Sequence, residues 1–256
     1  VVRKKEKEGP LGSYFDHIYE DTTLGEKSWE KAESRLQQEA VGRVLTKTSL
    51  SSRDIDFIVA GDLLNQCIGS TYGIQIYEIP FLGVYGACST MAESLIVASL
   101  LAESGAARHC VAVTSSHFCS AERQFRFPLE YGGVRTPTAQ WTATASGAVI
   151  VSPDGDGPYV KAVTVGRIED LGIKDANNMG AAMAPAAAST IKAYLEDTGE
   201  SPDNFDLILT GDLGYVGKDL LIKLLLRENI DISKVHNDCG LMIFDRERQD
   251  VHAGGS

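Results

Sequence analysis

The sequence contains an internal repeat that limits the folds it can adopt. IDFIVAGDLL at 55–64 recurs as FDLILTGDLG at 205–214, with five of the ten positions identical and an offset of 150 residues. Each copy follows a segment of helical spacing and a serine that opens a turn, which indicates that whole supersecondary units are duplicated. Short solenoid repeats, with periods of about 20 to 50 residues, are excluded by this spacing. The alternative is a chance match between two strands of common composition.

Helical and strand patterns alternate along the rest of the chain. Ser28 is a suitable N-cap for a helix whose apolar residues recur at helical spacing, and Gly105 is a suitable end for a second helix that is apolar on most faces. We expect that second helix to be central. The predicted helices cover 28–44, 89–104 and a segment bracketed by Pro185 and Gly199, and the predicted strands cover 55–60, 81–85, 109–116, 141–151 and 159–166. The last two strands are expected to pair antiparallel, and the order as a whole predicts a layered α/β fold.

The offset of the repeat divides the chain into two halves, 1–152 and 153–256. The sequence stops in the Gly-rich stretch HAGGS, so we expect the second half to be incomplete. Five cysteines with no regular spacing argue against a disulfide framework and for a reducing compartment inside the cell.

Charge and hydropathy exclude several classes of protein. Lys and Arg number 24 against 35 Asp and Glu, and a net charge of −11 disfavours nucleic acid as a partner. No apolar run approaches the ~20 residues that span a bilayer, so any membrane contact is expected to be peripheral. The first ten residues, VVRKKEKEGP, lack the apolar stretch of a secretory signal.

Cys88 in GACSTMAES lies between a predicted strand and a predicted helix. Free N–H groups at the start of a helix stabilise a thiolate, so this is a suitable position for a nucleophile. The small neighbours Gly86, Ala87 and Ser89 leave room for a ligand to approach the backbone. The alternative is a small buried side chain at a tight junction, since free cysteine is among the most buried residue types.

The strand, the small-small-Cys-Ser sequence, the apolar helix and the duplication together resemble the thiolase superfamily, which includes the ketoacyl synthases. Longer stretches resemble a particular family, that of stage V sporulation protein AD of endospore-forming bacteria. These stretches are KEKEGPLG, AGDLLNQ, YGACST, TSSHFCSAERQFRFPLEYGG, AMAPAAA, LILTGDL and HNDCGLMI. The resemblance implies a duplicated thiolase-like fold of layered α/β/α/β/α architecture with mixed sheets.

The same resemblance implies a function. Members of the family take part in moving dipicolinic acid, usually with calcium, into the developing spore and in its release at germination. It also implies a homodimer, peripherally attached to the forespore or spore inner membrane through other stage V sporulation A membrane proteins.

One departure from the catalytic relatives is important. In ketoacyl synthases with a Cys-His-Asn triad, the strand that matches FDLILT is followed by His, whereas this chain has Gly211 and Asp212 there. A carboxylate cannot polarise a thioester carbonyl as a neutral imidazole does, and its charge would raise the pKa of a nearby cysteine. His236 is a candidate to replace the missing imidazole, and the sequence alone does not place it.

Dipicolinate presents two carboxylates in one plane, which favours bidentate arginine. Arg123 and Arg126 lie among aromatic residues in AERQFRFPLEYGG, which we expect to be a loop rather than a helix. The alternative is that they pair with Glu122 and Glu130.

Other polar residues complete the candidate ligand set. Asp62 and Asp212 would contact calcium together with Glu122 if the ligand arrives as a chelate, or they serve only to cap turns. Asn65 follows Asp62 and offers a neutral donor. His117 is expected to line the cavity of Cys88, or else to be a hydrogen-bonded loop histidine.

The HxC and HxxC spacings of the histidines and cysteines fit no familiar zinc site, so we expect neither a resident metal nor a cofactor. Three functions remain open at this stage. They are a dipicolinate-binding protein with a degenerate thiolase site, a Cys88-dependent acyltransferase or condensing enzyme, and a structural subunit that docks to membrane proteins.

Overall fold

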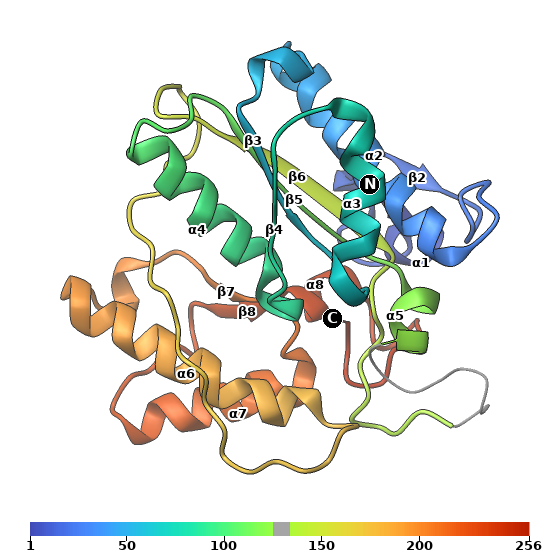
Figure 1. Ribbon diagram of the computed structural model, residues 1–256. Coiled ribbons are helices and arrows are strands. Elements are labelled where there is room, and N and C mark those ends of the chain that lie inside the picture. Colours follow the sequence, from blue (N-terminus) through green and yellow to red (C-terminus); the bar gives the residue numbers. More distant parts are fainter. Residues whose placement is uncertain (125–133, 256) are drawn as a thin grey trace. The chain divides into compact units, whose positions relative to one another are not determined.

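The computed structural model describes residues 1–124 and 134–255 (Figure 1). By their internal contacts these residues form two compact units. The first consists of Val1–Lys7, Ser13–Gly133 and Thr142–Lys161, and the second of Glu8–Gly12, Val134–Trp141 and Ala162–Ser256.

The first unit is built on a six-stranded mixed sheet with the order β2-β1-β6-β5-β3-β4 (Figure 1). Strands β3, β4 and β5 are parallel, and β6 is antiparallel to both β5 and β1. Val59 in β3 pairs with Leu82 in β4 on one side and with Ala112 in β5 on the other. The strands are β1 Val2–Arg3, β2 Ile18–Tyr19, β3 Phe57–Gly61, β4 Phe81–Gly83, β5 Cys110–Ser116 and β6 Ala145–Val151.

Helices pack on both faces of this sheet. Alternate residues of a strand point to opposite faces, so Ile58 joins a core cluster with Val41 of α2 while Val59 joins another with Ala98 of α4. The helices of the unit are α1 Lys4–Lys7, α2 Trp29–Thr48, α3 Ile68–Ile74, α4 Thr90–Glu103 and α5 Phe118–Gln124.

Helix α2 shows why the sequence begins and ends a helix at these points. The Ser28 hydroxyl accepts a hydrogen bond from the Lys31 N–H at 3.3 Å, which confirms the predicted N-cap. At the other end Ser49 takes a left-handed conformation with φ of 57°, and its N–H satisfies carbonyls of the last turn.

The second unit contains a two-stranded parallel sheet of β7 and β8. Its core cluster includes Ala184 of α6, Leu221 and Leu225 of α7, and Ile232. Asn178 caps the start of α6 by accepting the Ala181 N–H. The elements are α6 Met179–Thr198, β7 Ile208–Thr210, α7 Gly214–Arg227, β8 His236–Asp238 and α8 Cys239–Ile243.

The sequence repeat corresponds to a repeat of structure. Helices α2 and α6 have the same length and differ in position by 150 residues, as do the 3-10 helices Ser52–Asp54 and Pro202–Asn204. Strands β3 and β7 follow at the same offset to within one residue. The match of three successive elements rules out chance similarity between two strands.

Three sequence predictions were wrong in detail. Residues 159–166 form no strand, and β6 pairs instead with β5 and β1. The predicted buried strand at 81–85 is the edge strand β4, in which Leu82 is 40% exposed. Helix α6 begins at Met179, so Pro185 lies inside the helix, whereas Gly199 caps its end as expected.

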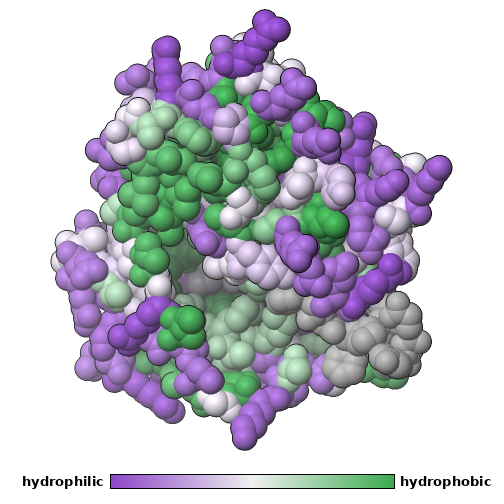
Figure 2. All heavy atoms as spheres, in the orientation of Figure 1, coloured by the Kyte–Doolittle hydropathy of each residue, from purple (hydrophilic) through white to green (hydrophobic). Residues whose placement is uncertain are grey.

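Helix α4 is less central than its composition indicated. Small or polar residues, such as Ser94 and Ala98, occupy its buried face, while Leu100 is 54% exposed. Figure 2 shows apolar side chains gathered on the surface over α4. None of the described helices has the length and apolar character needed to cross a membrane.

Candidate functional site

Cys88 occupies the predicted junction in the first unit. It lies in the 3-10 turn Ala87–Ser89, which leads directly into α4. The turn is tight because Ala87 has a φ of 48°, in the left-handed region that a side chain disfavours. Gly86 lies close to the side chains beside it, since a Cβ there would lie 2.5 Å from both Glu93 Oε2 and Ser89 Oγ and these groups would have to move. The half-buried Cys88 thus stands at the positive end of a fourteen-residue helix.

The other four cysteines are in environments that suppress reactivity. Burial raises the pKa of the Cys67, Cys110, Cys119 and Cys239 thiols, to about 11 for Cys110 and for Cys239. A raised pKa leaves little thiolate at neutral pH, and the thiolate is the nucleophile. These four cysteines are therefore poor candidates for chemistry.

Asp62 is engaged by the turn that follows β3. It is only 2% exposed; Oδ1 accepts the Leu64 N–H at 2.8 Å, and Oδ2 accepts the Ser70 N–H at 2.7 Å and the Ser70 hydroxyl at 2.5 Å. This is the turn-capping alternative stated for Asp62. A ligand role would require it to give up these bonds, and the assignment of Asp62 to the ligand set stays a prediction.

A buried polar network that the sequence analysis missed joins Asp62 to α2. Ser115 Oγ lies 3.2 Å from Glu33 Oε1 and Ser120 Oγ lies 2.7 Å from Glu33 Oε2. Gln37 Nε2 lies 3.0 Å from Ser115 Oγ and also donates to the Ser70 hydroxyl, which is bonded to Asp62. The sequence pattern could have predicted the burial of these two side chains. Glu33 and Gln37 are four residues apart on the face of the helix that carries its buried apolar residues.

Glu33 is held as the neutral acid in this network. Desolvation, with the negative charge of Asp62 second, raises the pKa of Glu33 from 4.5 to about 8. The hydrogen bonds are consistent with the neutral form of Glu33. A protonated Glu33 can donate to Ser120 Oγ, while the Ser120 hydroxyl donates to the His117 carbonyl at 3.0 Å. Glu33 can therefore donate as well as accept a hydrogen bond within the network.

His117 and Asn65 make contacts within the first unit. His117 is fully buried, its Nε2 lies 2.8 Å from the Thr22 carbonyl oxygen, and its Nδ1 accepts the Cys119 N–H. Burial lowers the pKa of His117, so it is neutral at pH 7. The backbone N–H of Asn65 donates to Gln124 Oε1 at 3.2 Å. Both ring nitrogens of His117 are thus occupied, as in the hydrogen-bonded alternative stated for it.

Of the two arginines in the predicted ligand loop, Arg123 lies among the described residues. Arg123 lies at the end of α5, so the expectation of a loop was wrong for this part of the segment. Its guanidinium is 3.2 Å from Glu30 Oε1 and stacks over the Trp29 ring at 4.6 Å. Glu122 is 6% exposed, and its Oε1 accepts from the Thr142 hydroxyl at 3.5 Å. Arg126 and Glu130 lie outside the described residues.

In the second unit, Asp238 rather than Asp212 caps the turn after β7. Asp238 is fully buried and accepts the N–H groups of Leu213, Gly214 and Gly240 at 2.9 to 3.0 Å. Asp212 itself has a left-handed φ of 68° and is half-buried. The duplicated aspartates therefore have different structural roles in the two copies.

His236 is bonded to the same aspartate through a threonine. The Thr210 hydroxyl donates to Asp238 Oδ2 at 2.8 Å and lies 2.9 Å from His236 Nε2. Because a carboxylate only accepts, Nε2 carries the ring proton and Nδ1 is the basic nitrogen. Among the described residues Nδ1 has no hydrogen-bond partner, and burial lowers the pKa of His236. His236 is therefore a neutral imidazole at pH 7.

The fold class follows from likeness to solved structures of condensing enzymes. A 3-oxoacyl-[acyl-carrier-protein] synthase III from Aquifex aeolicus VF5 is 16% identical with a TM-score of 0.55, over 93% of this chain and 74% of that one. The priming β-ketosynthase of the R1128 polyketide pathway is 16% identical with a TM-score of 0.58, over 87% and 70%. OleA of Xanthomonas campestris reaches a TM-score of 0.61 at 13% identity, over 80% and 65%. The chain has a thiolase-like fold, as its sequence predicts.

Sequence similarity identifies the family within that class. The family model of stage V sporulation protein AD matches residues 1–256. Stage V sporulation protein AD of Bacillus subtilis (strain 168) is 48% identical over 252 residues, which cover 98% of this chain and 74% of that protein. The chain belongs to the stage V sporulation protein AD family.

Proposed function

We propose that this protein binds dipicolinic acid, free or as its calcium chelate, and serves its uptake into the developing spore and its release at germination. Family membership supports a role in sporulation. The observation that carries the choice of binding over catalysis is the turn after β7, where Gly211 and Asp212 stand in place of the histidine of ketoacyl synthases.

The chemistry of this turn argues against acyl transfer by the usual route. An ionised carboxylate at Asp212 donates no hydrogen bond to a developing oxyanion, and its negative charge opposes one. His236 does not lie in this turn but on β8, with its ring proton committed to Thr210. A thiolase-like protein altered in this way retains a site for a ligand without the group that activates an acyl carbonyl.

The ligand chemistry indicates which residues to test. Two coplanar carboxylates are best met by a guanidinium, and Arg123 is already engaged by Glu30 and Trp29. We therefore assign the principal carboxylate contact to Arg126, with Cys88 as a further contact of the ligand. The other proposed ligand residues are Asp62, Asn65, His117, Arg123, Asp212 and His236.

Isothermal titration calorimetry with dipicolinate, with and without calcium, tests the proposal. Arg126→Ala is expected to weaken binding roughly ten- to a hundredfold, because a charge-assisted hydrogen bond contributes about 1.5–3 kcal/mol. Cys88→Trp is expected to abolish binding by filling the site. Arg227→Ala is the matched control, since Arg227 is exposed on α7. Absence of binding heat with either form of the ligand would refute the proposal.

Assembly and location form part of the same proposal. The protein is expected to act as a homodimer, attached peripherally to the spore inner membrane through other stage V sporulation A membrane proteins. The edge strand β4 supports a dimer, because within the described residues only one of its sides is paired. Leu82 and Tyr85, 40% and 49% exposed, would be covered by a second copy.

A second candidate function is a Cys88-dependent acyltransferase of the condensing-enzyme type. The position of Cys88 at the N-terminus of α4 favours it, since a helix start stabilises a thiolate. Incubation with radiolabelled acyl coenzyme A distinguishes the two functions. Stable label on the parent protein that is absent from Cys88→Ser would support transfer, and no label on either would exclude it.

A further inference from the structure

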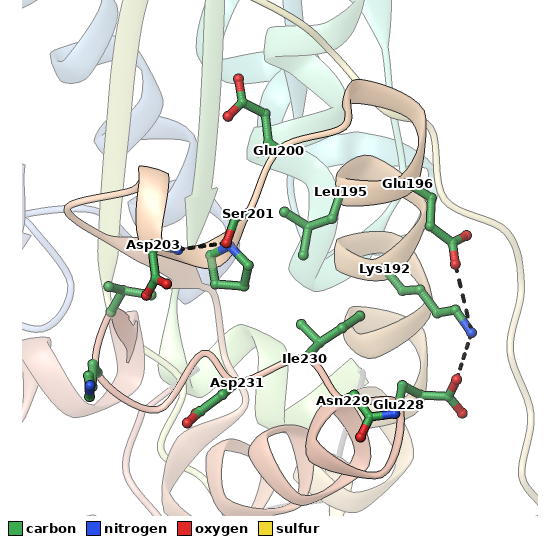
Figure 3. Close-up of a pocket in the computed structure, with 13 residues that line it drawn as sticks. Lys192, Leu195, Glu196, Glu200, Ser201, Asp203, Glu228, Asn229, Ile230 and Asp231 are labelled. Atoms are coloured by element: carbon green, nitrogen blue, oxygen red, sulfur yellow. Dashed lines mark hydrogen bonds and ion pairs between the residues drawn. The ribbon is translucent and has the colours of Figure 1, made fainter.

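A cavity of about 740 Å³ opens in the second unit where α6 and α7 end (Figure 3). The segment around the 3-10 helix Pro202–Asn204 forms another side. Leu195, Pro202 and Ile230 supply apolar surface to its lining. The carbonyl ends of two helices add partial negative charge at this place. None of the predicted ligand residues lines this cavity.

Carboxylates outnumber ammonium groups around the cavity, with five acidic side chains and two lysines in its lining. Lys192 Nζ lies 2.7 Å from Glu228 Oε2 and 4.0 Å from Glu196 Oε1 (Figure 3). The cavity therefore already holds one ammonium group between two carboxylates. Glu200 and Asp203 have no ion-pair partner within the part of the chain that the structure describes, so negative charge remains unneutralised.

The first copy of the repeat provides an internal comparison. At the offset of 150 residues, the second copy's Glu196, Glu200 and Asp203 correspond to Thr46, Leu50 and Arg53 of the first. Leu50 packs against the core cluster of the first unit. These three acidic residues are therefore a property of the second copy alone and do not follow from the helix–turn–strand unit that both copies share.

The lining restricts the kind of ligand. Among the described residues, no group of three His, Cys, Asp or Glu could hold a metal ion, and anions are repelled. Groups that fit carry a positive charge on an alkyl stem, because the stem can lie on Leu195 and Ile230 while the head reaches a carboxylate. The volume lies in the range of about 300–1,000 Å³ that accommodates a ligand of many atoms, which favours several side chains over one amine.

We propose that this acidic cavity docks a segment of a partner protein that is rich in lysine or arginine. Loops of membrane proteins on the cytoplasmic side have this composition. The inference is independent of dipicolinate binding, because it concerns other residues and a different ligand.

Fluorescence anisotropy at low ionic strength tests the docking, with a fluorescein-labelled peptide in which lysine alternates with alanine. The double variant Glu200→Lys with Asp203→Lys is expected to weaken peptide binding about tenfold or more, because two attractive contacts become repulsive. The matched control is Glu103→Lys with Asp154→Lys, which changes the net charge equally at exposed positions of the first unit. The control is expected to change binding less than about twofold.

Equal weakening by both double variants would overturn the proposal, because it would assign the attraction to net charge. Competition by spermidine at the same concentration as unlabelled peptide would also overturn it, since the cavity would then recognise a small polyamine rather than a peptide segment. Glu200→Leu, which installs the residue of the first copy, is expected to lower peptide affinity while the circular dichroism spectrum is unchanged. Dipicolinate calorimetry is expected to be unaffected in all these variants, so the two proposals fail separately.

Discussion

Replacement of Glu33 by glutamine is expected to stabilise the protein at pH 8 and to flatten the dependence of its stability on pH. Glu33 is fully buried, and burial together with the charge of Asp62 raises its pKa to about 8. The folded state therefore holds a proton on Glu33 that the unfolded chain has released. Because the folded pKa lies above the unfolded value of 4.5, this contribution to stability is complete below pH 4.5 and is lost as the pH rises to about 8.

The size of this change in stability follows from the interval between the unfolded and the folded pKa of Glu33. Each pH unit between 4.5 and about 8 lowers the free energy of unfolding of the parent protein by up to about 1.4 kcal/mol. The whole interval therefore lowers it by about 5 kcal/mol at most. Glutamine carries no charge, and its amide can donate to Ser120 Oγ while its oxygen accepts from Ser115. Relaxation around a charged Glu33 reduces the difference, so we expect Glu33→Gln to be more stable than the parent by about 2–3 kcal/mol at pH 8.

Urea unfolding at a series of pH values between 5.5 and 8.5 measures the difference in the free energy of unfolding between Glu33→Gln and the parent. A Trp141→Phe background leaves Trp29, the first residue of α2, as the fluorescent reporter of the first unit. The difference between variant and parent cancels the other titrating groups, which both chains share. Glu103→Gln, at an exposed position of α4, provides the control and is expected to give a constant difference. A constant difference for Glu33→Gln as well would refute the assignment of a neutral Glu33.

Three further outcomes are expected. Asp238→Ala leaves three backbone N–H groups and the Thr210 hydroxyl without their acceptor, and urea unfolding is expected to show a loss of about 3 kcal/mol or more. Iodoacetamide is expected to label Cys88 before the other four cysteines, whose pKa values burial raises, and peptide mass spectrometry reads the order. Leu82→Lys is expected to shift sedimentation from the proposed dimer to a monomer, whereas Leu226→Lys on α7, 46% exposed, is not.

Local patterns in the sequence were sufficient for much of the fold. Ser28, the spacing of apolar residues after it and the repeat at 55–64 predicted α2 and β3, because caps and burial periodicity act within a few residues. The alternation in 159–166 was misleading, since a strand also needs a neighbour to pair with and a sequence does not reveal it. The edge position of β4 was missed for the same reason.

Side-chain roles at the candidate site were harder to predict than backbone elements. The sequence analysis assigned no role to Glu33 and Gln37, although their spacing places them on the buried face of the helix. Their partners Ser70, Ser115 and Ser120 come from other segments, so the network exists only after the chain has folded. Arg123 was grouped with Arg126 by composition, whereas its contacts are with Glu30 and Trp29.

The two copies of the repeat show how a duplicated backbone can serve different side-chain functions. In the first copy the N–H of Leu64 is capped by Asp62, which lies two residues earlier. At the same offset in the second copy, the N–H of Gly214 is capped by Asp238 from the neighbouring strand. Asp212 is thereby relieved of the capping contact that its counterpart makes. Its carboxylate stands in the turn after β7, so the same turn carries a capping aspartate in the first copy and a non-capping one in the second, on a backbone that the two copies share.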